Sequence, residues 1–358
     1  MTKKIKIHDP FFDNKEKNAI LKVLDSHNWA MSKGNGLVSK FEEQFKNFVG
    51  AKDCVAVDSC SMALLISMSM LDIKNKEVII PSLSHVSLAH SIILNGGKPV
   101  LVDIDPKTLC LDPALVKKAI SNKTKIIAPV HFGGIPCDLT SLKKLAHDYN
   151  LQLVEDAALA TGSKYNKKYV GRHSDFVCFS FHPVKIMSSP KGGIIALNGK
   201  HSKRIKQKIS FLRNSGYNSI TESVKNLGYN AYMNEFSASI CLEQLKKLKT
   251  ITKKRLDVVT RYSNEIHSLE KMPFNKECSY SFYWIKIKNQ KSFFNKMNDN
   301  NIEIVNYHPP IHTLEYYKTE KKLENTENAY KHLALLPVHP NLTNNDIDKI
   351  IHLANKFS

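Results

Sequence analysis

The sequence predicts an α/β protein with a large, mixed but mostly parallel β-sheet domain flanked by helices and a smaller C-terminal α+β domain. Two observations predict this. From about residue 53 to 198, short runs of Val, Ile and Leu alternate with helical patterns, which is typical of strands covered by helices on both faces. After about residue 200, one long helical region is followed by short mixed elements. We therefore assign residues 1–245 to the large domain and residues 246–358 to the small one.

Each element follows from its local pattern. A helix is expected at Lys15–Leu24, and another at Leu139–Tyr149, where Asp138 can cap an apolar stripe. Residues 234–267 indicate a long helix, and Phe282–Ile287 a strand of the small domain. Seven apolar runs predict the strands of the large sheet: Cys54–Val57, Val78–Ile80, Val100–Ile104, Ile126–Val130, Leu151–Glu155, Phe176–Phe179 and Gly193–Leu197. Such sheets bind ligands at the carboxyl ends of their strands, which is where we look for chemistry.

Lysine dominates the charge of the chain. There are 52 Lys and Arg against 33 Asp and Glu, a net charge of +19, but only five of the basic residues are Arg. This balance by itself favours a nucleic-acid or anionic membrane partner. Base readout and phosphate clamps use Arg preferentially, however, and no Arg cluster or nucleic-acid-binding motif is found. We interpret most of the charge as Lys on a solvated surface, and we expect neither nucleic acid nor a membrane as partner.

Cysteine usage indicates the compartment. Seven cysteines are scattered without a C-x-x-C pair, which predicts buried free thiols in a reducing cytoplasm. No apolar segment follows the basic residues at the amino terminus, so we expect no signal peptide. No run of 18 apolar residues is present to span a bilayer. We predict a cytoplasmic location.

Two strand ends carry candidate catalytic residues. The run Leu151–Glu155 delivers Asp156, and the run Phe176–Phe179 leads through Ser180 to Lys185. The two charged residues could form a plain structural ion pair. A buried Lys is also a Schiff-base nucleophile, because desolvation frees its amine. An Asp beside a pyridinium nitrogen is what a pyridoxal 5′-phosphate (PLP) site requires, since the protonated ring withdraws electrons.

Several blocks of residues occur in an order and spacing that identify a family. They are Val57–Leu64, Pro81–Leu88, Gly97–Pro106, Val130–Asp138, Glu155–Ala158, Ser180–Lys185, Gly228–Asn230, Leu242–Leu245 and Tyr307–His312. Over nearly its whole length the chain resembles the DegT/StrS-like family of PLP-dependent sugar aminotransferases. The resemblance implies the fold of the fold-type I PLP enzymes and a homodimer with shared active sites.

The resemblance also implies a role for each matching residue. Lys185 would hold PLP covalently and act as the catalytic proton carrier, and Asp156 would pair with the pyridinium nitrogen. The phosphate would be held by Cys60 and Ser61 at a helix amino terminus, and by Ser180. Two further assignments complete the cofactor site: His85 would stack on the ring, and Asn230 would reach the phosphate of the partner subunit. The residues expected to bind substrate are His182, Lys191, Tyr307, His308 and His312.

Five positions depart from the family pattern. His85 stands where an aromatic residue is usual, Cys60 replaces the glycine of the phosphate turn, and Leu159 replaces Gln or His. Two charge changes accompany them, because Lys191 replaces an acidic residue and Tyr232 replaces Arg or Lys. Charge around the site is therefore redistributed, while the pair of Lys185 and Asp156 is kept.

The reaction expected from this resemblance is a ping-pong transamination. An amino acid, L-glutamate by resemblance, donates its amino group to PLP, and the ketone of a nucleotide-linked sugar for a surface glycan accepts it. Relatives with His at the lysine position are dehydratases, and Lys185 argues against that branch. An alternative acceptor is a small phosphorylated ketone or ketose, suggested by Lys191. No metal site is expected, and a basic nucleic-acid-binding or regulatory protein is the distant alternative.

Overall fold

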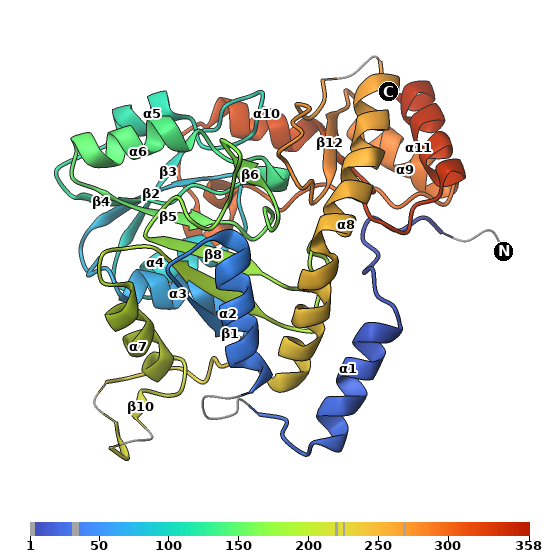
Figure 1. Cartoon of the computed structure of the whole chain (residues 1–358). Helices are drawn as coiled ribbons and strands as arrows, with labels where there is room; N and C mark the ends of the chain where they lie inside the picture. Colours follow the sequence, from blue (N-terminus) through green and yellow to red (C-terminus); the bar gives the residue numbers. More distant parts are fainter. Residues whose placement is uncertain (1–3, 31–35, 219–220, 225, 268–269) are drawn as a thin grey trace.

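A seven-stranded mixed sheet forms the centre of the large domain (Figure 1). The computed structural model describes residues 4–30, 36–218, 221–224, 226–267 and 270–358. In spatial order the strands are β1 (Asp53–Val57), β9 (Gly193–Leu197), β8 (Phe176–Ser180), β5 (Gln152–Asp156), β4 (Thr124–Ile127), β2 (Glu77–Pro81) and β3 (Lys98–Val102). Strands β8, β5, β4, β2 and β3 pair in parallel, whereas β9 is antiparallel to both of its neighbours. The predicted fold class and all seven predicted strands are confirmed.

The strand bounds differ from the prediction where proline intervenes. We predicted Ile126–Val130, but β4 ends at Ile127 and Pro129, which has no N–H group, interrupts the ladder. Val130 then returns to the sheet as an isolated bridge to Asp156. Strand β3 begins two residues earlier than predicted and includes Pro99. Proline is tolerated there because β3 lies at the edge of the sheet.

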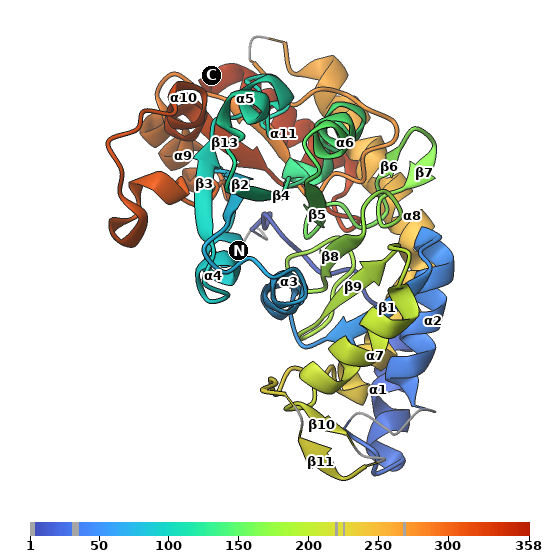
Figure 2. The same cartoon turned by 90° about the vertical axis from the view of Figure 1, so that its left-hand side faces the viewer.

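Helices cover both faces of the sheet (Figures 1 and 2). One face packs on α3 (Cys60–Ser69), α4 (Ser87–Ile93) and α7 (Ser202–Leu212). The opposite face packs on α2 (Leu37–Val49), α5 (Pro113–Ala119), α6 (Leu139–Asp148) and α8 (Glu235–Glu265). The predicted helix after residue 138 is confirmed with its cap, because the Asp138 carboxylate accepts a hydrogen bond from the Ser141 N–H. All seven cysteines are buried and free, as expected.

The C-terminal part forms a smaller α+β unit beside the sheet domain. Its elements are β12 (Tyr283–Lys286), α9 (Gln290–Asp299), α10 (Glu324–His332), β13 (Leu333–Leu336) and α11 (Asn344–Phe357). Strands β12 and β13 pair antiparallel, which confirms the predicted strand at 282–287. The long helix α8 runs without interruption through residues 245 and 246. The predicted domain boundary thus falls inside one helix and stays a prediction.

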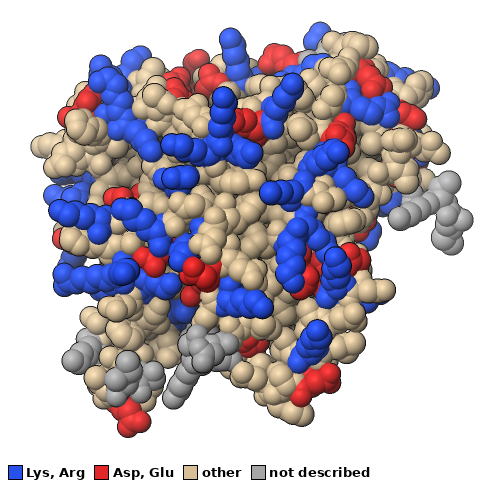
Figure 3. Space-filling model, viewed as in Figure 1, with Lys and Arg blue, Asp and Glu red and all other residues tan. Residues whose placement is uncertain are grey.

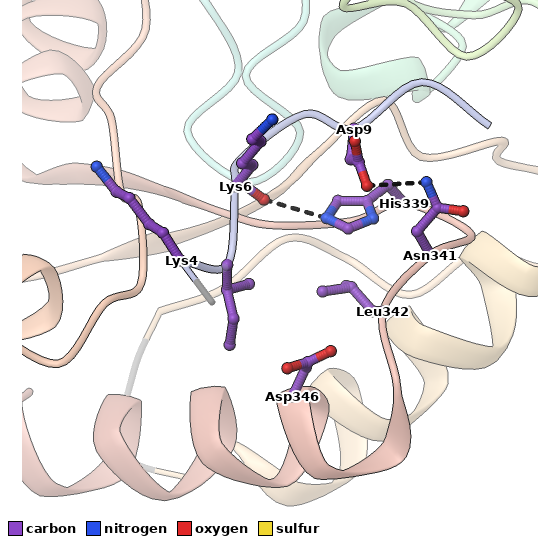
Figure 4. Close-up of a pocket in the computed structure, with 8 residues that line it drawn as sticks. Lys4, Lys6, Asp9, His339, Asn341, Leu342 and Asp346 are labelled. Carbon is purple, nitrogen blue, oxygen red and sulfur yellow. Dashed lines mark hydrogen bonds between the residues drawn. The ribbon is translucent and has the colours of Figure 1, made fainter. Parts of the chain in front are cut away.

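The amino-terminal segment ties the small unit to the rest of the chain. Ile5 forms a parallel bridge with Ile302, and the Ile7 N–H donates to the Glu303 carboxylate. His339 Nε2 donates a hydrogen bond to the Lys6 carbonyl at 3.1 Å, a contact drawn in Figure 4. We call residues 5–9 the amino-terminal strap. Beyond it the chain enters α1 (Asn14–Asp25), which packs along α8 (Figure 1). The strap therefore reaches from the small unit to the long helix.

Two short hairpins were not predicted. Strands β6 (Lys164–Tyr165) and β7 (Lys168–Tyr169) form one, and β10 (Tyr217–Asn218) and β11 (Ser223–Val224) form the other. Figure 2 shows the β10–β11 hairpin extending away from the body of the molecule. Among the described residues, no helix combines the length and apolar character needed to cross a bilayer.

Candidate active site

A cavity of about 330 Å³ lies where the carboxyl ends of β1, β5 and β8 meet. Its walls also include the first turns of α3 and α4, the turn before β9, and residues 307–308 of the C-terminal part. It brings together ten of the predicted site residues: Cys60, Ser61, His85, Asp156, Ser180, His182, Lys185, Lys191, Tyr307 and His308. The strand ends and the family resemblance therefore lead to one shared cavity, and the roles of its residues stay predictions.

Lys185 lies in the turn that follows β8. Its N–H donates to the His182 carbonyl at 2.8 Å, which closes a tight turn at the wall of the cavity. Desolvation lowers the pKa of Lys185, and the negative charge of Asp156 opposes this shift. A lowered pKa increases the fraction of neutral amine at physiological pH, which is the form that attacks a carbonyl carbon.

Asp156 is the last residue of β5 and is 5% exposed. Burial raises its pKa, while a hydrogen bond from the Ala158 N–H at 3.0 Å and the charge of Lys185 oppose the shift. The other carboxylate oxygen has no hydrogen-bond donor among the described contacts. A buried carboxylate with an open oxygen is suited to a cationic ring nitrogen.

A buried hydrogen-bond network centred on Glu155, which we call the buried relay, lies next to Asp156 in the chain. Glu155 lies on β5 with its side chain fully buried, and it accepts hydrogen bonds from His131 Nε2 at 2.9 Å and from the Ser174 hydroxyl. The Cys137 N–H donates to His131 Nδ1 at 3.1 Å, so the proton of the ring lies on Nε2. Sequence reasoning missed this relay, because His131 lies 24 residues before Glu155 and Ser174 lies 19 residues after it.

The first turn of α3 forms the other end of the cavity. Ser59 caps the helix by accepting from the Met62 N–H, and Cys60 and Ser61 follow as the first helical residues. Cys60 replaces a glycine without strain, because a residue that starts a helix takes a negative φ. Gly193 of β9 packs against this turn so closely that a Cβ there would lie 2.5 Å from the Ser59 carbonyl carbon.

The mouth of the cavity is lined by imidazoles. The pKa of His85 is lowered to about 4, first by desolvation and then by the nearby His308 and Lys185. The Ser87 N–H donates to His85 Nδ1 at 3.2 Å, which requires an unprotonated nitrogen there. The ring meets His308 edge-on with centroids 4.9 Å apart. Desolvation also lowers the pKa values of His182 and His308, so the group is neutral at physiological pH.

Comparison with known proteins decides the family. The model of the DegT/DnrJ/EryC1/StrS aminotransferase family matches residues 10–354. The chain belongs to this family. The aminotransferase is 30% identical over 368 residues to the GDP-perosamine synthase of Vibrio cholerae, covering 99% of each chain. It is also 30% identical to the spore coat polysaccharide biosynthesis protein SpsC of Bacillus subtilis, covering 96% of this chain and 94% of SpsC.

A solved structure agrees with the fold. Helicobacter pylori PseC, an aminotransferase involved in pseudoaminic acid biosynthesis, superimposes with a TM-score of 0.93 at 25% identity and covers 99% of both chains. The predicted enzyme class, the fold-type I architecture and the PLP cofactor are therefore confirmed for this aminotransferase.

The residues of the cavity fit this cofactor. Lys185 offers an amine, Asp156 an open carboxylate oxygen, and the turn at Ser59–Ser61 the N–H groups of a helix amino terminus. These three match, in the same order, the aldehyde, the ring nitrogen and the phosphate of PLP. The hydroxyl of Ser180 lines the same cavity, as expected for a further phosphate contact.

Two predicted residues of the aminotransferase lie outside this cavity. Asn230 is exposed and forms a bridge with Asn214. His312 is buried, and its ring bonds to the Ser82 hydroxyl at 2.7 Å and the Glu327 carboxylate at 3.3 Å. The structure of one chain therefore does not bring either residue to Lys185. Among the described residues, no group of three or more His, Cys, Asp or Glu could hold a metal ion.

One residue near the site of the aminotransferase was missed in the sequence. His8 lies in the amino-terminal strap, and its pKa is lowered to about 4 by desolvation, by Arg255 and by the charges of Lys185 and His182. The strap residues on either side of His8 are bonded to the small unit, through Ile7 and through the Asp9 carboxylate (Figure 4). No local motif marks His8, because its position depends on contacts with residues some 300 positions away.

Proposed function

We propose that this aminotransferase moves the amino group of L-glutamate to the ketone of a nucleotide-linked sugar in surface glycan biosynthesis. The observation that carries the proposal is the full-length similarity to a GDP-perosamine synthase, together with the cavity built around Lys185. SpsC and PseC, whose names place them in polysaccharide and pseudoaminic acid biosynthesis, support the same class of acceptor. We place the reaction in the cytoplasm, since the cysteines are free thiols.

Each residue of the site has its own role in the two-stage transamination cycle. Bound PLP supplies an electron sink that stabilises negative charge on the carbon that carries the amino group. Asp156 would hold the proton on the ring nitrogen of the bound cofactor, which maintains that sink. Lys185 Nζ removes the proton from Cα of the donor in the first stage, and it returns a proton to the acceptor carbon in the second. Tyr307 and the neutral imidazoles of His182 and His308 contact the acceptor.

The alternative acceptor, a small phosphorylated ketone, depended on Lys191 as a free cation. The Lys191 ammonium lies 2.7 Å from the Asp58 carboxylate, so its charge already has a partner. This contact favours the nucleotide-linked sugar. Parallel assays with nucleotide keto-sugars and ketose phosphates test the choice, and turnover of ketose phosphates alone would refute it.

The cofactor role of Lys185 is tested by absorption spectroscopy. The purified protein is expected to carry the visible band of lysine-bound PLP, to lose it with L-glutamate as pyridoxamine phosphate forms, and to regain it with the keto-sugar. Lys185→Ala is expected to remove the band, and Lys144→Ala, at an exposed helix position, to keep it. A colourless wild type, or a band that glutamate leaves unchanged, contradicts the proposal.

A homodimer with shared sites is part of the proposal. Asn230 lies outside the cavity of its own chain, and apolar side chains near the β10–β11 hairpin are exposed, with Leu227 at 95% and Val224 at 62%. Such surface is typical of an interface. The variants Lys185→Ala and Asn230→Ala are each expected to be inactive alone. After the two are mixed and their subunits exchange, half of the dimers contain one subunit of each kind, and each such mixed dimer has one intact site out of two. The mixture is therefore expected to regain about a quarter of wild-type activity. Failure of dimers to complement would assign Asn230 to its own chain or to no site.

A further inference from the structure

An ion pair stands beside the expected phosphate position. The Lys191 ammonium lies 2.7 Å from Asp58 Oδ2, and Asp58 Oδ1 accepts a hydrogen bond from the Ser59 hydroxyl at 2.9 Å. Ser59 is the cap of α3, so the carboxylate sits immediately before the helix whose amino terminus faces the cavity. Lys191 and Ser59 both line the cavity. The pair joins residues 133 positions apart, at the end of β1 and in the turn before β9.

The placement of Asp58 creates an electrostatic conflict for an anionic ligand. A carboxylate next to a helix amino terminus is stabilised by the same N–H groups that attract a phosphate. An unpaired Asp58 would therefore repel the phosphate and compete for the positive end of α3. No Arg lines the described cavity, and Lys191 is its only lysine besides Lys185. Lys191 is thus the cation available to cancel the charge of Asp58.

The exposed fractions of the two side chains indicate which charge is stabilised more by the ion pair. The side chain of Asp58 is 19% exposed, whereas that of Lys191 is 64% exposed. Water can solvate a Lys191 ammonium without help, but it solvates the Asp58 carboxylate poorly. The Asp58 N–H also donates to the Ala231 carbonyl at 2.8 Å, so its main chain is held in place. Asp58 is the fixed member of the pair, and Lys191 is the member that adapts to it.

We propose that Lys191 is a positioning residue for the cofactor, which neutralises Asp58 so that the amino terminus of α3 can accept the phosphate of PLP. The inference rests on the proposed site. It replaces the expectation that Lys191 binds the substrate directly. In this role the ammonium need not touch the phosphate, because its effect is exerted through Asp58.

Binding of pyridoxamine phosphate and of pyridoxamine to the full-length apoprotein tests this role, because the two ligands differ by the phosphate alone. We expect Lys191→Met to weaken pyridoxamine phosphate binding about tenfold, the effect of one uncompensated carboxylate near an anion at partly screened distance. Pyridoxamine binding is expected to stay within about twofold, since it carries no phosphate. Lys144→Met is the matched control, because Lys144 pairs with Asp148 at 2.9 Å on an exposed helix.

The double variant decides between two roles for Lys191. If Lys191 acts through Asp58, then Asp58→Asn combined with Lys191→Met restores pyridoxamine phosphate binding to within about twofold of wild type. If Lys191 holds the phosphate itself, the double variant stays as weak as Lys191→Met, and the inference is wrong. Equal binding by Lys191→Met and wild type also overturns it. A wild type that binds neither ligand would instead refute the proposed site.

Discussion

Replacing His131 with Ala tests whether the buried relay behind Asp156 stabilises the large domain. His131 and Glu155 have fully buried side chains joined at 2.9 Å, and the Cys137 N–H donates to the other ring nitrogen at 3.1 Å. Removing the imidazole deprives a buried carboxylate of one of its two side-chain donors, which costs about 2–3 kcal/mol. It also leaves the Cys137 N–H without an acceptor, at about 1 kcal/mol, and opens a small cavity, at about 1–2 kcal/mol. The expected loss in the free energy of unfolding is about 4–6 kcal/mol.

Urea unfolding of the apoprotein, followed by far-UV circular dichroism, measures this loss. The variant His147→Ala serves as control, because its side chain is 91% exposed and the expected change is below about 0.5 kcal/mol. Adding Glu155→Gln to His131→Ala is expected to recover about 1–2 kcal/mol, since an amide tolerates a missing donor better than a carboxylate does. A loss below about 1.5 kcal/mol for His131→Ala, or no recovery in the double variant, would refute the reasoning.

Three further predictions concern the cavity and the charges close to it. Capture of PLP by the apoprotein should accelerate with rising pH and level off below pH 10.5, because desolvation lowers the pKa of Lys185 and only its neutral amine reacts. Asp156→Asn removes a negative charge that raises the pKa of Lys185, so it should shift the inflection of the rate profile to lower pH. An inflection at the same pH in this variant would contradict the reasoning. In an NMR pH titration of the apoprotein, the His8 ring should titrate with a midpoint near 4, because desolvation and the charges of Arg255 and Lys185 lower its pKa; its signal is assigned by its loss in His8→Ala, and a midpoint near 6.5 would contradict this. Gly193→Ala should weaken PLP binding about tenfold or more, since its Cβ would displace the turn at Ser59, and wild-type affinity would show that the turn can move freely.

The sheet could be predicted because its strands are buried on both faces. Runs such as Phe176–Ser180 and Gly193–Leu197 are entirely buried, so apolar residues fill every position and mark the strands directly. The orientation of β9 could not be predicted in the same way. Parallel and antiparallel strands buried on both faces have the same composition, and pairing with both β1 and β8 is fixed only by the tertiary fold.

The clustering of the candidate residues could be predicted where they lie at strand ends. Asp156 ends β5 and Lys185 follows β8, and the parallel pairing of these strands brings their carboxyl ends together. The Asp58–Lys191 pair and His8 could not be found this way. Each depends on which side chain a distant segment presents, and no local pattern of residues encodes that contact.

The net charge does not explain how this aminotransferase attracts phosphate. Figure 3 shows Lys and Arg spread over one face of the molecule, with Asp and Glu among them. Two of the five Arg are buried in structural contacts, Arg213 with Glu42 and Arg255 with three main-chain carbonyls. Among the described residues, the lining of the cavity includes two lysines, Lys185 and Lys191, and Lys191 is paired with Asp58. In the proposed site, the phosphate depends on short-range contacts from the first turn of α3, from Ser180 and from Asn230 of the partner subunit. Such contacts act over a few ångströms and are screened little by salt, whereas the fields of surface lysines are screened within about 10 Å at 0.1 M salt. Salt should weaken the approach of a charged acceptor more than it weakens the hold on PLP.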